Sequence, residues 1–310
     1  EATEAVSLET TLPSGLRGTA IWVHVRAAKI SDTSVLLLVD DRTEAHRLDE
    51  TRRDFIANVS HELKTPIGAI SLLAEALQDA CDDPDMVKKF SKDLYRESKR
   101  LGSLVKDIIQ LSRLQSAEIT GSAKLVELHE VVTEAVELNR HAAERRNVKI
   151  AVEAPEEIFV IGDQGMLVTA VRNLIENAIT YSDDNSQVGI GLSVGKDIAN
   201  IAVTDSGIGI SPEDQGRIFE RFYRVDPSRS RQTGGTGLGL SIVKHVAHNH
   251  RGEIAVFSRP GVGSTFTLRI PVAGAAAVVK DKAEKKAVKK AAKKSEASKT
   301  EKKTNKKAKK

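Results

Sequence analysis

Apolar residues recur along two long stretches of the chain with the spacing of α-helices. From residue 43 to about residue 80 they form one stripe, at Phe55, Val59, Leu63, Ile67, Ile70, Leu73 and Leu77. From residue 86 to about residue 115 they alternate in steps of three and four, with a break at Glu97, at Val87, Phe90, Leu94, Leu101, Leu104, Ile108 and Leu111. The second spacing is typical of a coiled-coil seam. The pattern therefore predicts two long helices joined by a turn at residues 81–85.

Two helices with one apolar stripe each cannot bury both stripes alone, whereas two such hairpins together make a four-helix bundle. We therefore predict an antiparallel helical hairpin over residues 43–116 that forms a homodimer. Cys81, the single cysteine, lies in the predicted turn. One cysteine excludes an internal disulfide and fits a reducing compartment, so we expect a buried thiol without a chemical role.

The pattern changes after a loop-like linker at residues 116–122, and a second domain is expected over residues 123–273. Strands are predicted at residues 148–152, 158–161, 188–194, 198–203, 254–257 and 265–270. Helices are predicted at residues 129–145, 164–179 and 239–250. This irregular alternation indicates an α/β sandwich, in which helices cover one face of a sheet, and makes the whole chain a multidomain α+β protein.

The N-terminal residues 1–42 predict a small β-structure. Residues 20–25 and 35–40 are apolar or β-branched runs, and the polar residues 29–34 between them suggest the turn of a hairpin. Two strands are too few to form a core of their own. The segment is therefore either a remnant of a larger domain or a strand pair that packs on nothing in particular.

Composition places the chain among ordinary soluble globular proteins. Its 310 residues, 40% hydrophobic and 29% charged, fit about two domains. No apolar run approaches the length that spans a bilayer. The chain also has no initiator methionine and no signal peptide, so we expect the soluble part of a longer protein.

The net charge of +4 conceals two opposite parts of the chain. Residues 280–310 contain 15 lysines and four acids, a net charge of +11, which leaves −7 for residues 1–279. Such a lysine- and alanine-rich segment predicts a disordered tail over residues 274–310. Without arginine or aromatic residues the tail is not expected to bind specific nucleic acid. A solubilising role is expected, with weak contact to anionic lipid as the alternative.

The most informative polar residue is His61, within the first predicted helix. It lies midway between Val59 and Leu63, so it faces away from the apolar stripe. A neutral imidazole can attack phosphorus if one ring nitrogen is free, and Glu62 could accept the proton of the other. Thr65 follows one turn later on the same face. Pro66 removes a backbone hydrogen bond and should bend the helix behind the nucleophile.

Three later blocks together suggest a nucleotide site. Asn173 and Asn177 share one helix face and offer amide oxygens that suit Mg²⁺, although a polar surface pair is the alternative. Asp205 follows a strand and could accept the amino group of adenine, while Gly207 and Gly209 allow close backbone approach or form a tight turn only. A glycine-rich run opens the last predicted helix and offers backbone N–H groups to phosphates: Gly235, Thr236, Gly237, Leu238 and Gly239.

From Asp54 to Pro271 these blocks resemble the two-component sensor histidine kinases, most closely the phosphate-responsive kinases of actinobacteria. The resemblance implies phosphorylation of His61 from Mg-ATP and transfer to an aspartate on a response regulator. It assigns Asn177 to the metal, Tyr181 and Thr265 to the adenine side, and Thr65 to a water that removes phosphate from the regulator. It also implies a PAS-like remnant over residues 1–42 and a cytoplasmic fragment of a protein anchored in the bacterial plasma membrane.

The sequence departs from that family at Thr180, where many relatives carry lysine or arginine. The positive charge for the phosphates must then come from elsewhere, and Arg224, Arg229 and Arg231 are the candidates. The polar residues 225–233 are expected to form a mobile lid over ATP. Thr180 also supports an alternative function, a nucleotide-gated scaffold that binds ATP without phosphotransfer.

Overall fold

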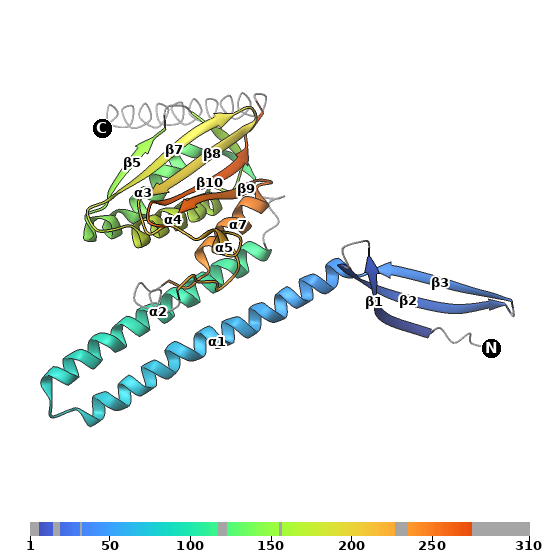
Figure 1. The fold of residues 1–310 in the computed structure, drawn as a ribbon, viewed down its shortest axis with the longest axis horizontal. Helices are drawn as coiled ribbons and strands as arrows, with labels where there is room; N and C mark the ends of the chain where they lie inside the picture. Colours follow the sequence, from blue (N-terminus) through green and yellow to red (C-terminus); the bar gives the residue numbers. More distant parts are fainter. Residues whose placement is uncertain are drawn as a thin grey trace, which may run out of the picture. The chain divides into compact units, whose positions relative to one another are not determined.

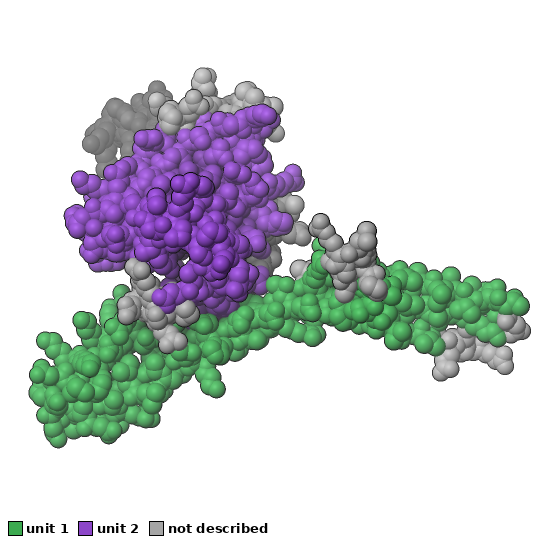
Figure 2. Space-filling model, viewed as in Figure 1, with its two compact units in different colours: residues 1–101 green, residues 102–310 purple. Residues whose placement is uncertain are grey.

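The fold is taken from a computed structural model that describes residues 6–14, 19–31, 33–116, 123–154, 157–226 and 235–274. The chain divides into two compact units, residues 1–101 and residues 102–310 (Figure 2). The boundary falls inside the second long helix, whereas the sequence predicts that the hairpin ends as a unit at residue 116. The predicted linker after Ser116 and the predicted tail after Gly274 lie outside the described residues.

The first unit begins with a three-stranded antiparallel sheet in the order β1-β2-β3. Its strands are β1 (Val6–Ser14), β2 (Thr19–Ser31) and β3 (Ser34–Asp41). The predicted hairpin is confirmed as β2–β3, but both strands are longer than predicted. Because Ser31 pairs with Ser34, the turn occupies only the residues between these two, and not residues 29–34.

The third strand, β1, was not predicted because its apolar residues are sparse among polar ones. The sheet buries little: Val23 is the one buried hydrophobic residue that it contributes within the described part of the unit. Five successive hydrophobic side chains of β3 are 45–63% exposed, namely Val35, Leu36, Leu37, Leu38 and Val39. The sheet thus lacks a core of its own, as expected from so few strands.

The end of the sheet is tied to the start of the first long helix. The Trp22 ring stacks on the His46 ring at a centroid distance of 3.7 Å. The backbone N–H of Trp22 donates to Thr43 Oγ1 at 2.9 Å, and the N–H of Arg42 donates to the carbonyl of Trp22 at 2.8 Å. These contacts fix the point at which β2 meets the helix.

The two predicted long helices are present as α1 (Thr43–Asp79) and α2 (Pro84–Ser116), which run antiparallel (Figure 1). α1 continues through Pro66 as an uninterrupted helix. α2 begins two residues before the predicted start, because proline is favoured in the first turn and Asp83 Oδ1 accepts the N–H groups of Asp85 and Met86. None of the helices in the described ranges is long and apolar enough to cross a membrane.

Cys81 is exposed, so the prediction of a buried thiol is wrong. The cysteine lies just past the end of α1, where the chain turns and no longer follows the apolar stripe. On α1 the stripe is only partly covered within one chain: Ile67 is 51% exposed. On the same helix Ile56 and Leu72 are 56% and 67% exposed, so the hairpin presents apolar surface to its surroundings.

The second unit is built on a five-stranded sheet in the order β5-β7-β8-β10-β9. Its strands are β5 (Lys149–Glu153), β7 (Gln187–Gly195), β8 (Ile198–Asp205), β9 (Glu253–Arg259) and β10 (Gly263–Pro271). The β5–β7 pair is parallel, and the other three pairs are antiparallel. All five strands were predicted to within a few residues.

Three helices cover one face of this sheet: α3 (Leu128–Arg145), α4 (Gln164–Tyr181) and α7 (Gly239–Asn249) (Figure 1). The strands alternate accordingly, with Val188, Ile190 and Leu192 of β7 buried and the residues between them more exposed. The largest fully buried side chains of the unit come from both layers, including Leu128, Leu167, Leu174, Ile175, Ile201, Ile242 and Leu268. The predicted α/β sandwich is therefore confirmed.

Two short strands, β4 (Lys124–Glu127) and β6 (Phe159–Gly162), pair beside the main sheet, and α5 (Pro212–Gln215) is a single turn. β6 was predicted because residues 158–161 are all apolar, whereas β4 and α5, with two apolar residues and one, were not. The end of α2 also belongs to this unit. Gln110 donates to Thr169 Oγ1 at 2.9 Å, and His245 Nε2 lies 3.0 Å from the carbonyl of Leu114.

A buried histidine joins the end of α7 to the start of α4. His250 Nδ1 bonds the carbonyl of Val246 at 2.8 Å, and its Nε2 accepts the backbone N–H of Asp163 at 3.1 Å. A Cβ on Gly162 would lie 2.3 Å from the imidazole, so only glycine allows this approach. Both nitrogens are thus used by the neutral ring, and burial lowers the pKa of His250.

We expect the second unit to lose stability as the pH falls below about 6.5, because unfolded His250 binds a proton at a higher pH than folded His250 does. One such proton gives a slope of up to about 1.4 kcal/mol per pH unit. Urea unfolding between about pH 7.5 and pH 5.5 measures it. H250Q should reduce the slope, whereas H248Q, at an exposed position of the same helix, should not. Equal slopes in all three proteins would contradict this role.

Candidate functional site

His61 lies on the solvent-exposed face of α1, as the sequence predicts. The neighbouring Glu62 is partly buried and faces the second helix of the hairpin. Its Oε2 lies 3.9 Å from Nη2 of Arg100, whose side chain is only 10% exposed and also reaches Glu97 at 3.5 Å. A guanidinium therefore holds the carboxylate beside the candidate nucleophile, and the predicted proton-accepting role of Glu62 stays a prediction.

Thr65 lies one turn after His61 and is exposed like it. Its Oγ1 donates to the carbonyl of His61 at 3.3 Å. The hydroxyl is thus kept on the face of α1 that carries the imidazole, which is the placement that the spacing predicts.

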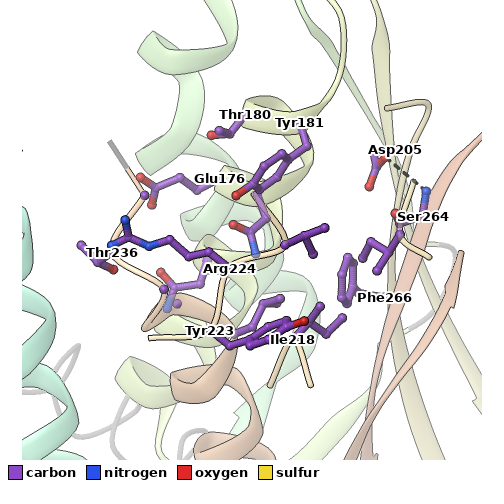
Figure 3. Close-up of a pocket in the computed structure, with 18 of the residues that line it drawn as sticks. Glu176, Thr180, Tyr181, Asp205, Ile218, Tyr223, Arg224, Thr236, Ser264 and Phe266 are labelled. Atoms are coloured by element: carbon purple, nitrogen blue, oxygen red, sulfur yellow. Dashed lines mark hydrogen bonds between the residues drawn. The ribbon is translucent and has the colours of Figure 1, made fainter. Parts of the chain in front are cut away.

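The second unit contains a cavity of about 460 Å³ (Figure 3). It is bounded by side chains of α3 and α4, by the end of β8, by the start of α7 and by β10. Ser103, Lys106 and Asp107, in the second half of α2, complete one wall. Nine predicted site residues line it: Asn173, Asn177, Tyr181, Asp205, Gly209, Arg224, Gly235, Gly237 and Gly239. The structure therefore brings together blocks that are up to 66 positions apart in the sequence.

Asp205 closes one end of the cavity at the last position of β8. Its Oδ1 accepts the backbone N–H groups of Gly207 at 2.9 Å and of Ser264 at 3.2 Å. Within the described residues both of its hydrogen bonds use Oδ1, which leaves Oδ2 for a ligand. Burial raises the pKa of Asp205, and the two N–H groups oppose that rise. The aspartate is thus a fixed acceptor for an amino group.

The wall beside Asp205 is apolar and suits a flat ring. Phe266 and Ile218 line it, and the Phe219 ring packs edge-on against the Phe266 ring at 6.4 Å. Tyr181 lies across the cavity from Phe266, as Figure 3 shows. An acceptor at the rim of an apolar slot is the arrangement that adenine requires.

Gly209 must be glycine for two reasons. Its φ is +70°, and a Cβ would lie 2.0 Å from the carbonyl oxygen of Arg259. The N–H of Gly261 donates in turn to the carbonyl of Ile208 at 2.7 Å, so two loops meet here without side chains between them. This close contact sets the edge of the cavity at the end that Asp205 closes.

We expect G209A to lower the free energy of unfolding by about 2 kcal/mol or more, because alanine adds left-handed backbone strain and a backbone clash. G191A is the matched control, since nothing lies within 4 Å of a Cβ on Gly191 of β7. Urea unfolding of both variants checks the difference. A loss of equal size in both proteins would show that Gly209 has no special conformational requirement.

The other end of the cavity offers groups for phosphates. α7 has 11 residues and begins at Gly239, so its free N–H groups face the cavity behind the glycine loop. Gly237 has a φ of +74°, and its carbonyl accepts the N–H of Phe222 at 2.9 Å. Asn173 lies against this loop, with its Cγ 3.9 Å from the place of a Gly239 Cβ. Asn177 faces the same space one turn later.

A hydrogen bond ties the glycine loop to the second half of α2. Thr236 Oγ1 donates to Asp107 Oδ2 at 2.7 Å and accepts the N–H of Leu238 at 3.2 Å. Burial raises the pKa of Asp107, while the hydrogen bond from Thr236 and the charges of Arg172 and Lys106 lower it. Neither Asp107 nor Lys106 was predicted as a site residue.

Three predicted site residues do not line the cavity. Thr265 lies on the other face of β10, where it contacts Thr204 across the strands at 3.0 Å, and its role on the adenine side stays a prediction. Its neighbour Ser264 lines the cavity instead. Leu238 is fully buried in the core beneath the loop. Gly207 allows its loop to pack against the backbone of Tyr181, because an added Cβ at this position would lie 2.3 Å from the carbonyl oxygen of Tyr181.

Of the three arginines predicted to supply positive charge for the phosphates, the structure places one at the cavity. Arg224 lines the cavity, whereas Arg229 and Arg231 lie outside the described residues, as does most of the predicted lid. Two cations that sequence reasoning missed, Lys106 and Arg172, also line it. Arg172 directly precedes Asn173 in the sequence, and this was the only feature of the sequence that could have indicated Arg172 as a site residue.

Comparison with known families matches the two parts of the chain separately. Residues 51–117 match the family described as His Kinase A (phospho-acceptor) domain. Residues 162–274 match the family described as Histidine kinase-, DNA gyrase B-, and HSP90-like ATPase. The first match contains His61, and the second contains the predicted nucleotide-site residues of the cavity.

Individual relatives agree with these family matches. The chain is 52% identical over 258 residues to the sensor-like histidine kinase SenX3 of Mycolicibacterium smegmatis, covering 83% of this chain and 67% of that protein. It is 37% identical to the phosphate regulon sensor protein PhoR of Pseudomonas aeruginosa, covering 78% and 55%. A crystal structure of ShkA with AMPPNP matches with a TM-score of 0.51 and 26% identity, over 72% of this chain and 46% of that one. The chain thus spans about half to two thirds of these curated relatives.

Proposed function

Because the chain belongs to the two-component sensor histidine kinases, related to the phosphate-responsive ones, we propose that it transfers the γ-phosphoryl group of ATP to His61. From there the group passes to an aspartate on the receiver domain of a response regulator. The observation that carries the proposal is the presence on one chain of an exposed imidazole and of a cavity with an adenine end and a phosphate end.

The cavity residues would bind ATP in one orientation. Asp205 Oδ2 accepts the amino group of adenine, with the ring between Tyr181, Ile218 and Phe266. The phosphates then extend toward the N-terminus of α7, where backbone N–H groups and the helix dipole favour negative charge. The side-chain amide of Asn173 faces the same end.

Asn177 would hold a Mg²⁺ ion together with the phosphates. No cluster of three metal-ligating side chains is present among the described residues, and one amide oxygen fits an ion that is held mainly by phosphate oxygens and water. Bound there, the ion supplies charge neutralisation for the transfer.

In the transfer, a ring nitrogen of His61 forms a bond to the γ-phosphorus as the bond to the bridging oxygen of ADP breaks. ADP leaves with the electron pair of that bond. The proton on the other ring nitrogen is the one that Glu62 would stabilise, and Arg100 lies 3.9 Å from that carboxylate. Arg100 is thus a positioning residue in this proposal, since it acts through Glu62.

The proposal is tested by incubating the protein with γ-labelled ATP and Mg²⁺. Label that is lost in acid and stable in base identifies phosphohistidine and supports it. Acid-stable label on serine or threonine would contradict it. Tight ATP binding without any label would instead support the nucleotide-gated scaffold, for which Thr180 is the only argument in the sequence.

A second activity, removal of phosphate from the response regulator, is proposed from Thr65. Its hydroxyl lies on the His61 face of α1 and could position the attacking water. We expect T65A to slow dephosphorylation of the phosphorylated regulator by at least about 10-fold, with autophosphorylation retained.

The control is T65S, which keeps the hydroxyl and should keep the phosphatase rate. The release of inorganic phosphate from the regulator measures the effect. If the T65A protein dephosphorylates the regulator as fast as the original protein does, Thr65 has no such role.

The homodimer remains a proposal, supported by the apolar side chains that the hairpin exposes in one chain. Ile56, Ile67 and Leu72 on α1 are more than half exposed, as is Tyr95 on α2. A second hairpin would cover them in a four-helix bundle. Sedimentation equilibrium of the full chain tests this: a dimer supports it and a monomer at all concentrations contradicts it.

The sensing and anchoring parts are also proposals. A PAS-like origin of β1–β3 would explain an open sheet with an exposed apolar strand β3. Anchoring of the full-length protein in the plasma membrane is proposed by analogy with the family, with this chain on the cytoplasmic side. Weak contact of residues 280–310 with anionic lipid is tested by vesicle binding of the chain with and without that segment. Equal binding would exclude it.

A further inference from the structure

Three cations line the cavity in the described part of the chain, and one of them occupies a position that suits the phosphates. These are Lys106, Arg172 and Arg224. Thr180, where the resembled family often has lysine or arginine, carries no charge. The positive charge that neutralises the phosphates must therefore come from a residue other than Thr180, which lies in the last turn of α4.

Arg172 has a donor that lacks an acceptor. Its Nε is buried without a hydrogen-bond partner, while its Nη2 donates to Asn173 Oδ1 at a long 3.4 Å. That bond fixes the orientation of the Asn173 amide, and Asn173 Nδ2 is likewise buried without a partner. Buried donors without acceptors are unfavourable, so a ligand rich in acceptors would relieve both.

The surroundings of Arg172 place it at the phosphate end of the cavity. Asn173 lies against Gly239, the first residue of α7. The charge of Arg172 lowers the pKa of Asp107, which bonds Thr236 in the glycine loop. Arg172 is thus linked through Asn173 to the start of α7, and it lines the same cavity as Asp107, which bonds the glycine loop.

We propose that Arg172 contacts the polyphosphate of ATP and supplies the positive charge that Thr180 lacks, with Asn173 Nδ2 as a second donor to the same oxygens. A planar guanidinium suits this task, because it can give two N–H groups to one phosphate. Asp107 lines the same cavity, and its carboxylate is stabilised by the charge of Arg172. This inference rests on the proposed binding of ATP and adds the residue that recognises its phosphates.

The test compares ATP and adenosine binding to the full chain, by calorimetry for ATP and by ligand-observed NMR for adenosine. We expect R172M to weaken ATP binding by about 10-fold or more and to leave adenosine binding unchanged. R172K should give an intermediate loss, because lysine keeps the charge without the fork. R269M is the matched control, since Arg269 is exposed on β10 and pairs with Glu253 outside the cavity.

Introducing a positive charge at position 180 tests the role of Arg172 independently. The double variant R172M/T180K should recover most of the lost ATP affinity, and this holds even if R172M alone is less stable. Equal ATP affinity in R172M and the original protein would overturn the role of Arg172, as would equal losses for ATP and adenosine. If the original protein itself binds no ATP, the proposed function fails and this inference with it.

Discussion

Replacing His61 by glutamine is expected to remove all acid-labile label after incubation with γ-labelled ATP. Glutamine keeps a polar side chain of similar size on the exposed face of α1 but has no nucleophilic ring nitrogen. Because His61 lies in the first unit and the cavity in the second, ATP affinity should be unchanged. Filter-bound label and calorimetric ATP binding, measured on the same preparation, check the two parts of this prediction.

The control is H141Q, a histidine on α3 whose side chain is 90% exposed and lies outside the cavity. That variant should be labelled like the original protein. Label that persists at full level in H61Q would place the phosphoryl group on another residue and would remove the basis of the proposed activity.

The second large effect is expected for D205N, which should weaken ATP binding by about 100-fold or more. The asparagine Oδ1 can still accept the N–H groups of Gly207 and Ser264, so the loop should stay folded. The side-chain NH₂ group of the asparagine replaces Oδ2, so a hydrogen-bond donor faces the amino group of adenine where an acceptor was. The variant thus loses a charge-assisted hydrogen bond and gains two facing donors.

Two measurements separate binding from stability in this variant. Urea unfolding should show that D205N stays folded, and calorimetry should show the loss of ATP affinity. A matched comparison with GTP is useful, because the amide at position 205 can donate to the O6 acceptor of guanine. Unchanged ATP affinity in a folded D205N protein would mean that Asp205 does not recognise adenine.

The fold was predictable wherever the apolar pattern was long. α1 and α2 extend over 37 and 33 residues, so their period is unambiguous. The central strands β7, β8 and β10 alternate between buried and more exposed residues because only one face of the sheet is covered. β4 and α5 have four residues each, few of them apolar, and their positions follow from pairing and capping in the folded chain.

The sequence motifs predicted which segments form the candidate site, but not every residue that lines it. Thr265 and Ser264 are neighbours, and a shift of one residue along a strand exchanges the two faces of the sheet. The sequence does not say which of them faces the nucleotide, whereas the pairing of Ser264 with Asp205 does. Lys106 and Asp107 belong to a helix far away in sequence, and their place in the cavity depends on tertiary packing that no local pattern encodes.

The most direct test of the central claim is to locate the phosphoryl group by tandem mass spectrometry at neutral pH after incubation with Mg-ATP. The account predicts that it is attached to the imidazole of His61, in the peptide that also contains Ser60 and Thr65. Attachment to either of those hydroxyl groups, or to a residue outside α1, would contradict it.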